Sequence, residues 1–471
     1  MRRKLFFSYL QIEMKKDVTL MNVIKFGGSS LASGSQLKKV VQIVKDDAAR
    51  KIVVVSAPGK RSAEDEKVTD LLIGFGMKAL AGHDYSSVLS KIVNRYQTIA
   101  EELSLGTEII GEIRQNLDDL INGNKDEPDY YLDAFKASGE NNNAKLVAAY
   151  FNKEGVPARY MNPKEAGLLV TNEPGNAQVL SESYEELAKM RDSEEVIVFP
   201  GFFGYTRDGK VCTFSRGGSD ITGSILANGI HADLYENFTD VDAIFTANPN
   251  VVENPIGIKE LTYREMRELS YGGFSVLHDE ALQPAFKLGI PVQIKNTNNP
   301  SASGTRIMKE RQLSDQGVIG IASSSGFSSI YIDKYLMNRE IGFGRKVLEI
   351  LESRGISYEH MPSGIDNLTI ILHSDQMSSE EEQSLLVQLE EELAADSVKV
   401  EHDIALIMIV GEGMRERMFT MSKAATAFSE NNINIDMINQ GASEVSVMFG
   451  IQAKHEDLAV KALYEAFFEK K

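Results

Sequence analysis

Between residues 22 and 296, short apolar runs alternate with longer segments that repeat apolar residues at helical spacing. We expect strands at 23–26, 51–56, 158–160, 167–171, 195–200, 234–238, 243–246 and 291–295, with a hairpin turning at 206–209. We expect helices at 37–49, 129–150, 221–230, 262–270 and 275–288, and several within 71–122. Strands that alternate with helices predict an α/β domain on a largely parallel, open sheet.

The pattern changes after residue 296. A polar stretch, TNNPSASGT at 297–305, predicts a linker that we extend to 297–317. Two similar units follow, at 344–366 and 421–444, each a helix, a turn and a strand, and each continues into a further strand, at 368–372 and 445–450. Such a repeat indicates two small α+β modules, placed at 318–398 and 399–471, that serve binding or assembly rather than a second catalytic centre.

Composition narrows the class of protein. The 471 residues carry a net charge of −18, which argues against a general nucleic-acid binder and against anionic membrane surfaces. The single cysteine, Cys212, excludes an intrachain disulfide and fits a cytoplasmic location. No apolar stretch approaches the ~20 residues of a membrane span. Residues 1–21 are expected to be an N-terminal extension ahead of the first strand.

The first candidate site is VIKFGGSS at 23–30, a buried strand that breaks into glycines and serines. Glycine lets backbone N–H groups approach an anion, Lys25 adds a positive charge, and a helix starting near 29–35 would present its N-terminus. The pattern predicts a phosphate cradle. It matches neither GxxxxGK[ST] nor GxGxxG, and a plain glycine-rich turn with a surface lysine is the alternative.

A second glycine-rich stretch, TFSRGGSDITG at 213–223, carries Arg216 and Asp220. Two such loops fit phosphoryl transfer, in which cations offset the charge on the transferred group. Lys25 and the amides of 27–30 would hold phosphates, Arg216 would grip a carboxylate, and Asp220 would hold Mg²⁺ or orient Lys25. The alternative for 216–220 is a local salt-bridged turn.

Glu140 follows Gly139 inside the predicted helix 129–150. A glycine in mid-helix is unfavourable unless something must approach closely there. Glu140 could then pair with a substrate ammonium, and the alternative is a solvated helix face. His278 is expected to be structural, and Cys212 has no neighbouring base that would make it a nucleophile.

Taken together, VIKFGGSS, SRGGSD at 215–220, Thr239-Asp240 and the doubled C-terminal module resemble an aspartokinase of the amino-acid-kinase family. The resemblance runs from about residue 22 to the end, with the C-terminal modules similar to paired ACT domains, and it is to monofunctional, lysine-sensitive members. It implies an amino-acid-kinase fold followed by two ferredoxin-like ACT modules. In the family the second ACT module can be inserted within the first, so the C-terminal strand can return to complete the first.

The resemblance implies ATP-dependent phosphorylation of the side-chain carboxylate of L-aspartate, the committed step toward lysine, threonine and methionine. Catalysis would fall to Lys25, Arg216 and Asp220, with Mg²⁺ near Asp220. The implied ATP-site positions are Lys25, Gly27, Gly28, Ser29, Thr239, Asp240, Phe245, Asn250, Ser275 and Val276. The implied aspartate-site positions are Ser56, Thr69, Glu140, Arg216, Gly217, Gly218 and Ser219.

The sequence departs from the family pattern at three positions. Asn250 stands where many relatives have arginine, Ser275 where lysine is frequent, and Asp279 where proline usually follows the histidine. These changes fall on the implied nucleotide pocket and on none of the phosphate-transfer residues.

The resemblance also implies feedback inhibition by an end-product amino acid, with lysine expected first and threonine as the other candidate. The effector would bind at an ACT–ACT interface of a homodimer or homotetramer, and the implied effector positions are Met337, Phe343, Gly344, Ser363 and Asp366. Two other functions stay open: a sister kinase acting on another small acid, and an amino-acid sensor without catalysis.

Overall fold

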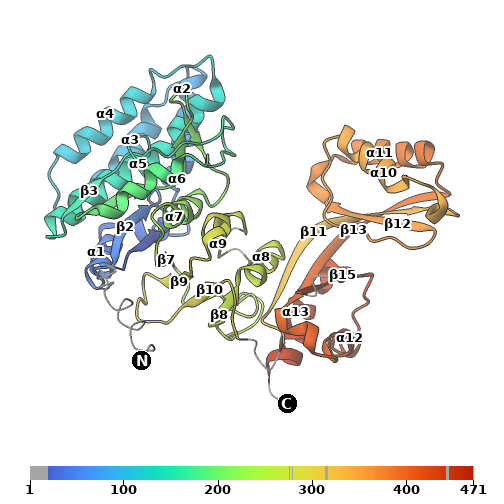
Figure 1. Cartoon of the computed structure of the whole chain (residues 1–471). Helices are drawn as coiled ribbons and strands as arrows, with labels where there is room; N and C mark the ends of the chain where they lie inside the picture. Colours follow the sequence, from blue (N-terminus) through green and yellow to red (C-terminus); the bar gives the residue numbers. More distant parts are fainter. Residues whose placement is uncertain (1–19, 275, 278, 313–316, 442–444, 470–471) are drawn as a thin grey trace, which may run out of the picture. The chain divides into compact units, whose positions relative to one another are not determined.

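The computed structural model describes residues 20–274, 276–277, 279–312, 317–441 and 445–469. The chain forms two compact units (Figure 1). One unit contains Met1–Ala243 and Glu280–Lys309, and the other contains Ile244–Asp279 and Glu310–Lys471. Residues 244–279, which the sequence analysis placed in the catalytic domain, therefore belong to the same unit as the C-terminal modules.

The first unit is built on a parallel sheet with the strand order β3-β4-β2-β1-β7-β9-β10. Its strands are β1 (Asn22–Phe26), β2 (Arg50–Val55), β3 (Ala158–Tyr160), β4 (Val196–Pro200), β7 (Leu234–Thr239), β9 (Val292–Asn296) and β10 (Thr305–Met308). Only β10 runs antiparallel, against β9. All five residues of β1 and of β4 are buried, as expected for strands covered on both faces.

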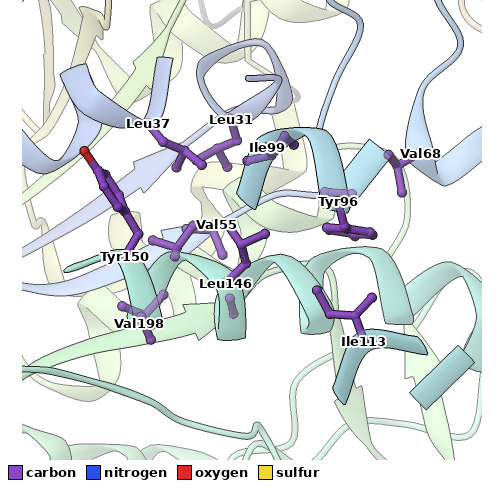
Figure 2. Close-up of a cluster of buried hydrophobic side chains, with 14 of the residues drawn as sticks. Leu31, Leu37, Val55, Val68, Tyr96, Ile99, Ile113, Leu146, Tyr150 and Val198 are labelled. Atoms are coloured by element: carbon purple, nitrogen blue, oxygen red, sulfur yellow. The ribbon is translucent and has the colours of Figure 1, made fainter. Parts of the chain in front are cut away.

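The helices of this unit follow the apolar periodicity. They are α1 (Gly34–Lys45), α2 (Val68–Leu80), α3 (Ser86–Glu102), α4 (Glu108–Leu120), α5 (Pro128–Lys153), α6 (Ser183–Leu187), α7 (Gly218–Gly229) and α9 (Gln283–Leu288). Figure 2 shows the core in which α3, α4 and α5 meet the sheet, with Tyr96, Ile113 and Leu146 turned toward one another. The predicted hairpin is confirmed as β5 (Phe203–Tyr205) and β6 (Val211–Thr213).

Three local predictions differ from the structure. Residues 167–171 and 243–246 form only isolated bridges, because each meets single partners rather than a strand edge. The predicted helix 275–288 is shorter, a 3-10 turn (Asp279–Leu282) and then α9, which begins at a proline-containing first turn. The predicted linker contains β10, whose hydrogen bonds to β9 no local pattern announces.

The second unit contains a five-stranded antiparallel sheet with the order β12-β11-β13-β15-β14. The strands are β11 (Gly320–Asp333), β12 (Asn367–His373), β13 (Ser397–Val410), β14 (Met437–Asn439) and β15 (Ser446–Gln452). Two separate hydrophobic cores lie on this sheet. One lies under α10 (Phe343–Ser353) and α11 (Ser379–Leu393), and the other under α12 (Thr420–Glu430) and α13 (Glu456–Phe468).

The two modules share their longest strands. In β11, residues 320–325 pair with 405–410 of β13, and residues 329–333 pair with 397–401. Each strand therefore runs through both modules, and the expected boundary at 398/399 falls inside β13. The C-terminal strand β15 pairs with 404–410 of β13, in the half of the sheet that also holds residues 320–325 of β11. The expectation that the C-terminal strand completes the first module stays a prediction.

The segment 244–279 contributes β8 (Glu260–Thr262) and α8 (Tyr263–Tyr271) to the second unit. Thr262 and Glu265 form a reciprocal capping box at the start of α8, which confirms the helix predicted at 262–270. Buried Glu265 also pairs with Arg311, and Glu268 accepts a hydrogen bond from Ser446. In the described residues no helix has the length and apolarity to span a membrane.

Candidate active site

Lys25 lies on the central strand β1 and is 7% exposed. Its Nζ is 2.5 Å from Oδ1 of Asp220, in the first turn of α7. Asn237, the partner of Lys25 in the β1–β7 register, donates to the same carboxylate oxygen over 2.7 Å. The lysine is therefore no surface residue, and the expectation that Asp220 orients Lys25 is consistent with this geometry.

The glycine-rich loop after β1 forms a single 3-10 turn, Gly28–Leu31, at the carboxyl edge of the sheet. A first turn leaves the N–H groups of Gly28 and Ser29 outside its own hydrogen bonds, so they are free to meet an anion. α1 itself begins only at Gly34, and the Gly34 N–H donates to Glu102 over 2.6 Å. The N–H at the start of α1 is thus already bound by the Glu102 carboxylate. The loop at 27–30, and not the N-terminus of α1, would therefore form the predicted phosphate cradle.

A second loop packs directly on this cradle. The N–H of Gly59 donates to the carbonyl of Gly28 over 2.9 Å, and a Cβ at Gly59 would lie 2.6 Å from the Gly28 carbonyl carbon. Buried Arg95 fixes this loop by donating to the Gly59 carbonyl and pairing with Asp65. The loop between β2 and α2 is therefore held firmly against the 27–30 loop.

Glu140 points inward from α5 and is 5% exposed, so it is not on a solvated helix face. Burial raises its pKa to about 8, although the N–H of Ala57 and the Lys25 ammonium act in the opposite direction. Oε2 of Glu140 and Oδ1 of Asn143 have no hydrogen-bond partner among the described residues, while Asn143 donates to the Ser56 carbonyl. Two free acceptor atoms thus lie one helical turn apart beside β2.

Gly139 explains how α5 comes this close. A Cβ there would lie 2.9 Å from Cβ of Ala57 and 3.0 Å from Cδ1 of Leu72. The absence of a side chain lets the helix approach the end of β2, which places Glu140 beside Lys25.

The second glycine-rich loop leads into α7. Gly217 adopts φ +79°, which favours glycine, and caps the helix from which Asp220 reaches Lys25. Arg216 is exposed, and within the described part of the chain its guanidinium has no ion pair. Since Asp220 pairs with Lys25 instead, the salt-bridged turn is excluded. Ser219 is buried and packs closely against Gly201. A Cβ added to Gly201 would lie only 2.6 Å from the Ser219 Oγ.

The remaining predicted positions divide between the units. Ser56 and Thr69 are half-buried, at the end of β2 and the start of α2. Thr239 ends β7 and donates to Asp240, and its carbonyl accepts from Thr297. Thr297 in turn contacts Ser30 through a hydroxyl pair at 2.7 Å, which ties this region to the cradle.

The other four nucleotide positions are not on the first unit. Phe245 and Val276 are half-buried and Asn250 is exposed on the second unit, and Ser275 lies outside the described residues.

Among the expected effector positions, Met337 and Phe343 are buried in the core of the first module. Gly344 is half-buried and Ser363 is exposed. Asp366 accepts hydrogen bonds from the backbone of Lys334 and Leu336 through its carbonyl and carboxylate. The side chains of Met337 and Phe343 thus pack in the core of that module.

Sequence reasoning did not find Asn237, Asn143 and Arg95. A usable signal existed for Asn237, because Glu236 and Asn237 are a polar pair between the aromatic residues Tyr235 and Phe238 of a buried strand. Asn143 lies in the run ENNN directly after Glu140, one turn away. Arg95 has no local signal, since its partners lie about 30 residues earlier in the chain.

Comparisons with known proteins agree with this fold. Residues 21–296 match the amino acid kinase family, and residues 407–467 match the ACT domain. Aspartokinase 3 of Bacillus subtilis (strain 168) is 63% identical over 448 residues, which is 95% of this chain and 99% of that protein. The chain therefore belongs to the amino acid kinase family and, within it, to the aspartokinases.

Solved structures give the same picture. Aspartate kinase from Clostridium acetobutylicum matches with a TM-score of 0.83 and 38% identity, over 95% of this chain and 100% of that one. E. coli aspartokinase III matches in complex with aspartate and ADP (R-state) and in complex with lysine and aspartate (T-state). Their TM-scores are 0.78 and 0.75, each at 25% identity over 95% of this chain and 100% of that one.

The close approach at Gly139 gives a stability prediction. On helix propensity alone, G139A would stabilise α5 by about 1 kcal/mol. The new methyl would overlap Ala57 and Leu72, so we expect a net destabilisation of about 1–3 kcal/mol. Urea denaturation measures this. G111A in α4 is the matched control, because a Cβ there meets nothing within 4 Å and should stabilise. Equal gains from both variants would contradict the packing argument.

Proposed function

We propose that this chain transfers the γ-phosphoryl group of ATP to the side-chain carboxylate of L-aspartate, giving 4-phospho-L-aspartate and ADP. The product would enter the biosynthesis of lysine, threonine and methionine. The observation that carries the proposal is the buried Lys25–Asp220–Asn237 cluster beside the Gly27–Ser30 loop. Family membership and the aspartate and ADP bound to E. coli aspartokinase III support it.

The chemistry requires two anions to meet. The substrate carboxylate is ionised at neutral pH, so no general base is needed to activate it. The barrier lies in charge repulsion, and preorganised cations lower it most effectively in a site that excludes water. Lys25, buried and aligned by Asp220 and Asn237, would stabilise the transferring phosphoryl group.

We assign the aspartate site to the two loops and α5. Arg216 has no competing partner among the described residues, so it would bind the α-carboxylate, with Gly217, Gly218 and Ser219 beside it. Glu140 would bind the α-ammonium through its unpartnered Oε2. Ser56 and Thr69 would complete this site.

We assign the nucleotide phosphates to Lys25 and to the loop at Gly27, Gly28 and Ser29. Thr239 and Asp240, tied to that loop through Thr297, would contact the nucleotide next to it. Phe245, Asn250, Ser275 and Val276 stay proposed contacts of the adenine or ribose.

Mg²⁺ would bind with the nucleotide. Within the described ranges no group of three or more His, Cys, Asp or Glu side chains could hold a metal by itself. Among the described residues, both contacts of the Asp220 carboxylate are made through Oδ1, so Oδ2 would remain for a cation. This fits Mg²⁺, which commonly takes one or two carboxylates plus substrate phosphates and offsets phosphate charge.

The catalytic assignment predicts the effect of removing either cation. We expect K25A and R216A each to lower kcat/KM for aspartate by about 10²–10³-fold, because each removes a preorganised charge from the site. ADP release with ATP, Mg²⁺ and L-aspartate measures this. K91A and R207A, which remove exposed cations paired at the surface, are the controls and should match the wild type. Normal rates in K25A or R216A would refute the assignment, and glutamate outrunning aspartate would favour a sister kinase.

The raised pKa of Glu140 predicts a pH dependence. Below about pH 8 the free enzyme holds Glu140 protonated, and binding an ammonium requires the carboxylate. KM for aspartate should therefore fall by about tenfold per pH unit from pH 6 toward 8 and then level off. In E140Q the amide cannot ionise, so KM should be high and flat. A slope retained in E140Q would show that another group titrates.

We propose that an amino-acid effector inhibits the enzyme through the ACT modules, with lysine first and threonine as the alternative. The lysine bound to E. coli aspartokinase III in its T-state supports the choice. The proposed effector positions are Met337, Phe343, Gly344, Ser363 and Asp366.

We further propose that a second copy of the chain covers the loops beside this site. Exposed apolar side chains gather on two hydrogen-bonded loops there, with Ile341 97% and Tyr335 73% exposed. Leu336 and Ile365 lie on the same loops. An exposed apolar cluster of this kind is typical of an oligomer interface.

Inhibition assays test the effector proposal. Lysine, threonine and methionine, alone and in pairs, should show lysine as the strongest single inhibitor. D366A should raise the half-inhibitory concentration by about tenfold or more while keeping the uninhibited rate, because Asp366 holds the loop at Leu336. D375A, an exposed carboxylate of the same module, is the control. Unchanged inhibition in D366A would place the effector elsewhere.

A further inference from the structure

Asp133 is a fully buried carboxylate that the catalytic proposal does not use. It lies on α5, seven residues before Glu140 and 0% exposed. Residues seven apart share a helix face, about 10 Å from each other along the axis. The helix that carries Glu140 therefore carries a second buried acid on the same side.

The contacts of Asp133 are all with donors. Oδ2 accepts from the Thr213 N–H at 2.7 Å, the Thr213 hydroxyl at 2.9 Å and the Gly175 N–H at 2.9 Å. Oδ1 pairs with Lys136 at 2.8 Å. A carboxylate only accepts hydrogen bonds, and a buried one this well satisfied holds its partners firmly.

Thr213 is the last residue of β6, three residues before Arg216. The Arg216 side chain is exposed and has no ion pair within the described residues. Its position therefore follows from the backbone of residues 213–217. That backbone is fixed at both ends. Asp133 holds it at Thr213, and at the other end Gly217 caps α7, whose Asp220 pairs with Lys25.

We propose that Asp133 is a positioning residue that sets the spacing between Glu140 and Arg216. This inference rests on the proposed function, in which those two side chains bind the α-ammonium and the α-carboxylate. Both groups are attached to one carbon atom, so their receptors must keep a fixed separation to within about 0.5 Å. The helix α5 carries Glu140 directly, and through Asp133 it also anchors the loop that carries Arg216.

The test compares KM for aspartate with KM for ATP in variants of Asp133 and Thr213. In D133N the carboxylate loses one acceptor, and we expect KM for aspartate to rise about tenfold, less than the ~10²-fold of a 1 Å misplacement. KM for ATP should stay unchanged and kcat should stay within about twofold. T213V, nearly isosteric, removes only the hydroxyl donor and should raise KM for aspartate by about twofold to threefold. If D133N does not fold, T213V decides.

Two controls separate positioning from general stability. E236Q weakens another buried ion pair, that of Glu236 with Arg50, and should lower the Tm without changing either KM. In an R216A background D133N should add little, because a residue acting through Arg216 has nothing left to position.

The outcomes are distinguishable. A rise in KM for both substrates, a purely thermal defect like that of E236Q, or full additivity with R216A would overturn the role of Asp133. An unchanged KM for aspartate in R216A itself would instead refute the proposed function of that arginine.

Discussion

The site depends on keeping one ammonium group buried on the central strand of a parallel sheet. An isolated charge in that position is strongly unfavourable, and it becomes tolerable only with a carboxylate and further hydrogen bonds around it. The carboxylate of Asp220 comes from 195 residues later in the chain, since 220 − 25 = 195. It reaches Lys25 because β7 pairs with β1 and because α7 begins at the carboxyl edge of the sheet. The strand order therefore determines whether the Lys25 ammonium has a carboxylate partner.

Close backbone approach is the second constraint. Gly28 and Gly59 face each other with no room for a side chain, and Gly139 lets α5 reach Ala57. Each contact brings a polar group toward Lys25: the amides of the cradle in the first case and Glu140 in the second. The three glycines lie on separate elements, yet they serve one purpose, which is to concentrate backbone and acidic groups around a buried cation.

The sequence predicted what local patterns can encode. The apolar runs at 23–26 and 195–200 predict strands because a strand buried on both faces is apolar nearly throughout, and in β1 Lys25 is the charged exception among Val23, Ile24 and Phe26. Gly139 was recognised as a close approach because glycine in mid-helix needs a reason. The strand β10 escaped prediction, since its stability comes from β9 and not from its own residues. Likewise Arg95 and Asp133 act on segments 29–36 and 42–80 residues away, which no motif records.

The division of the chain also bears on regulation. Phe245, Asn250 and Val276, proposed nucleotide contacts, belong to the same compact unit as the ACT modules. Within that unit α8 is tied to the modules by Glu265, which accepts from the Glu412 N–H, and by Glu268, which accepts from Ser446. An effector can shift activity only by binding one state better than another. Because β11 and β13 run through both modules, a change in either module acts on strands that the other module shares. The same unit carries Phe245, Asn250 and Val276.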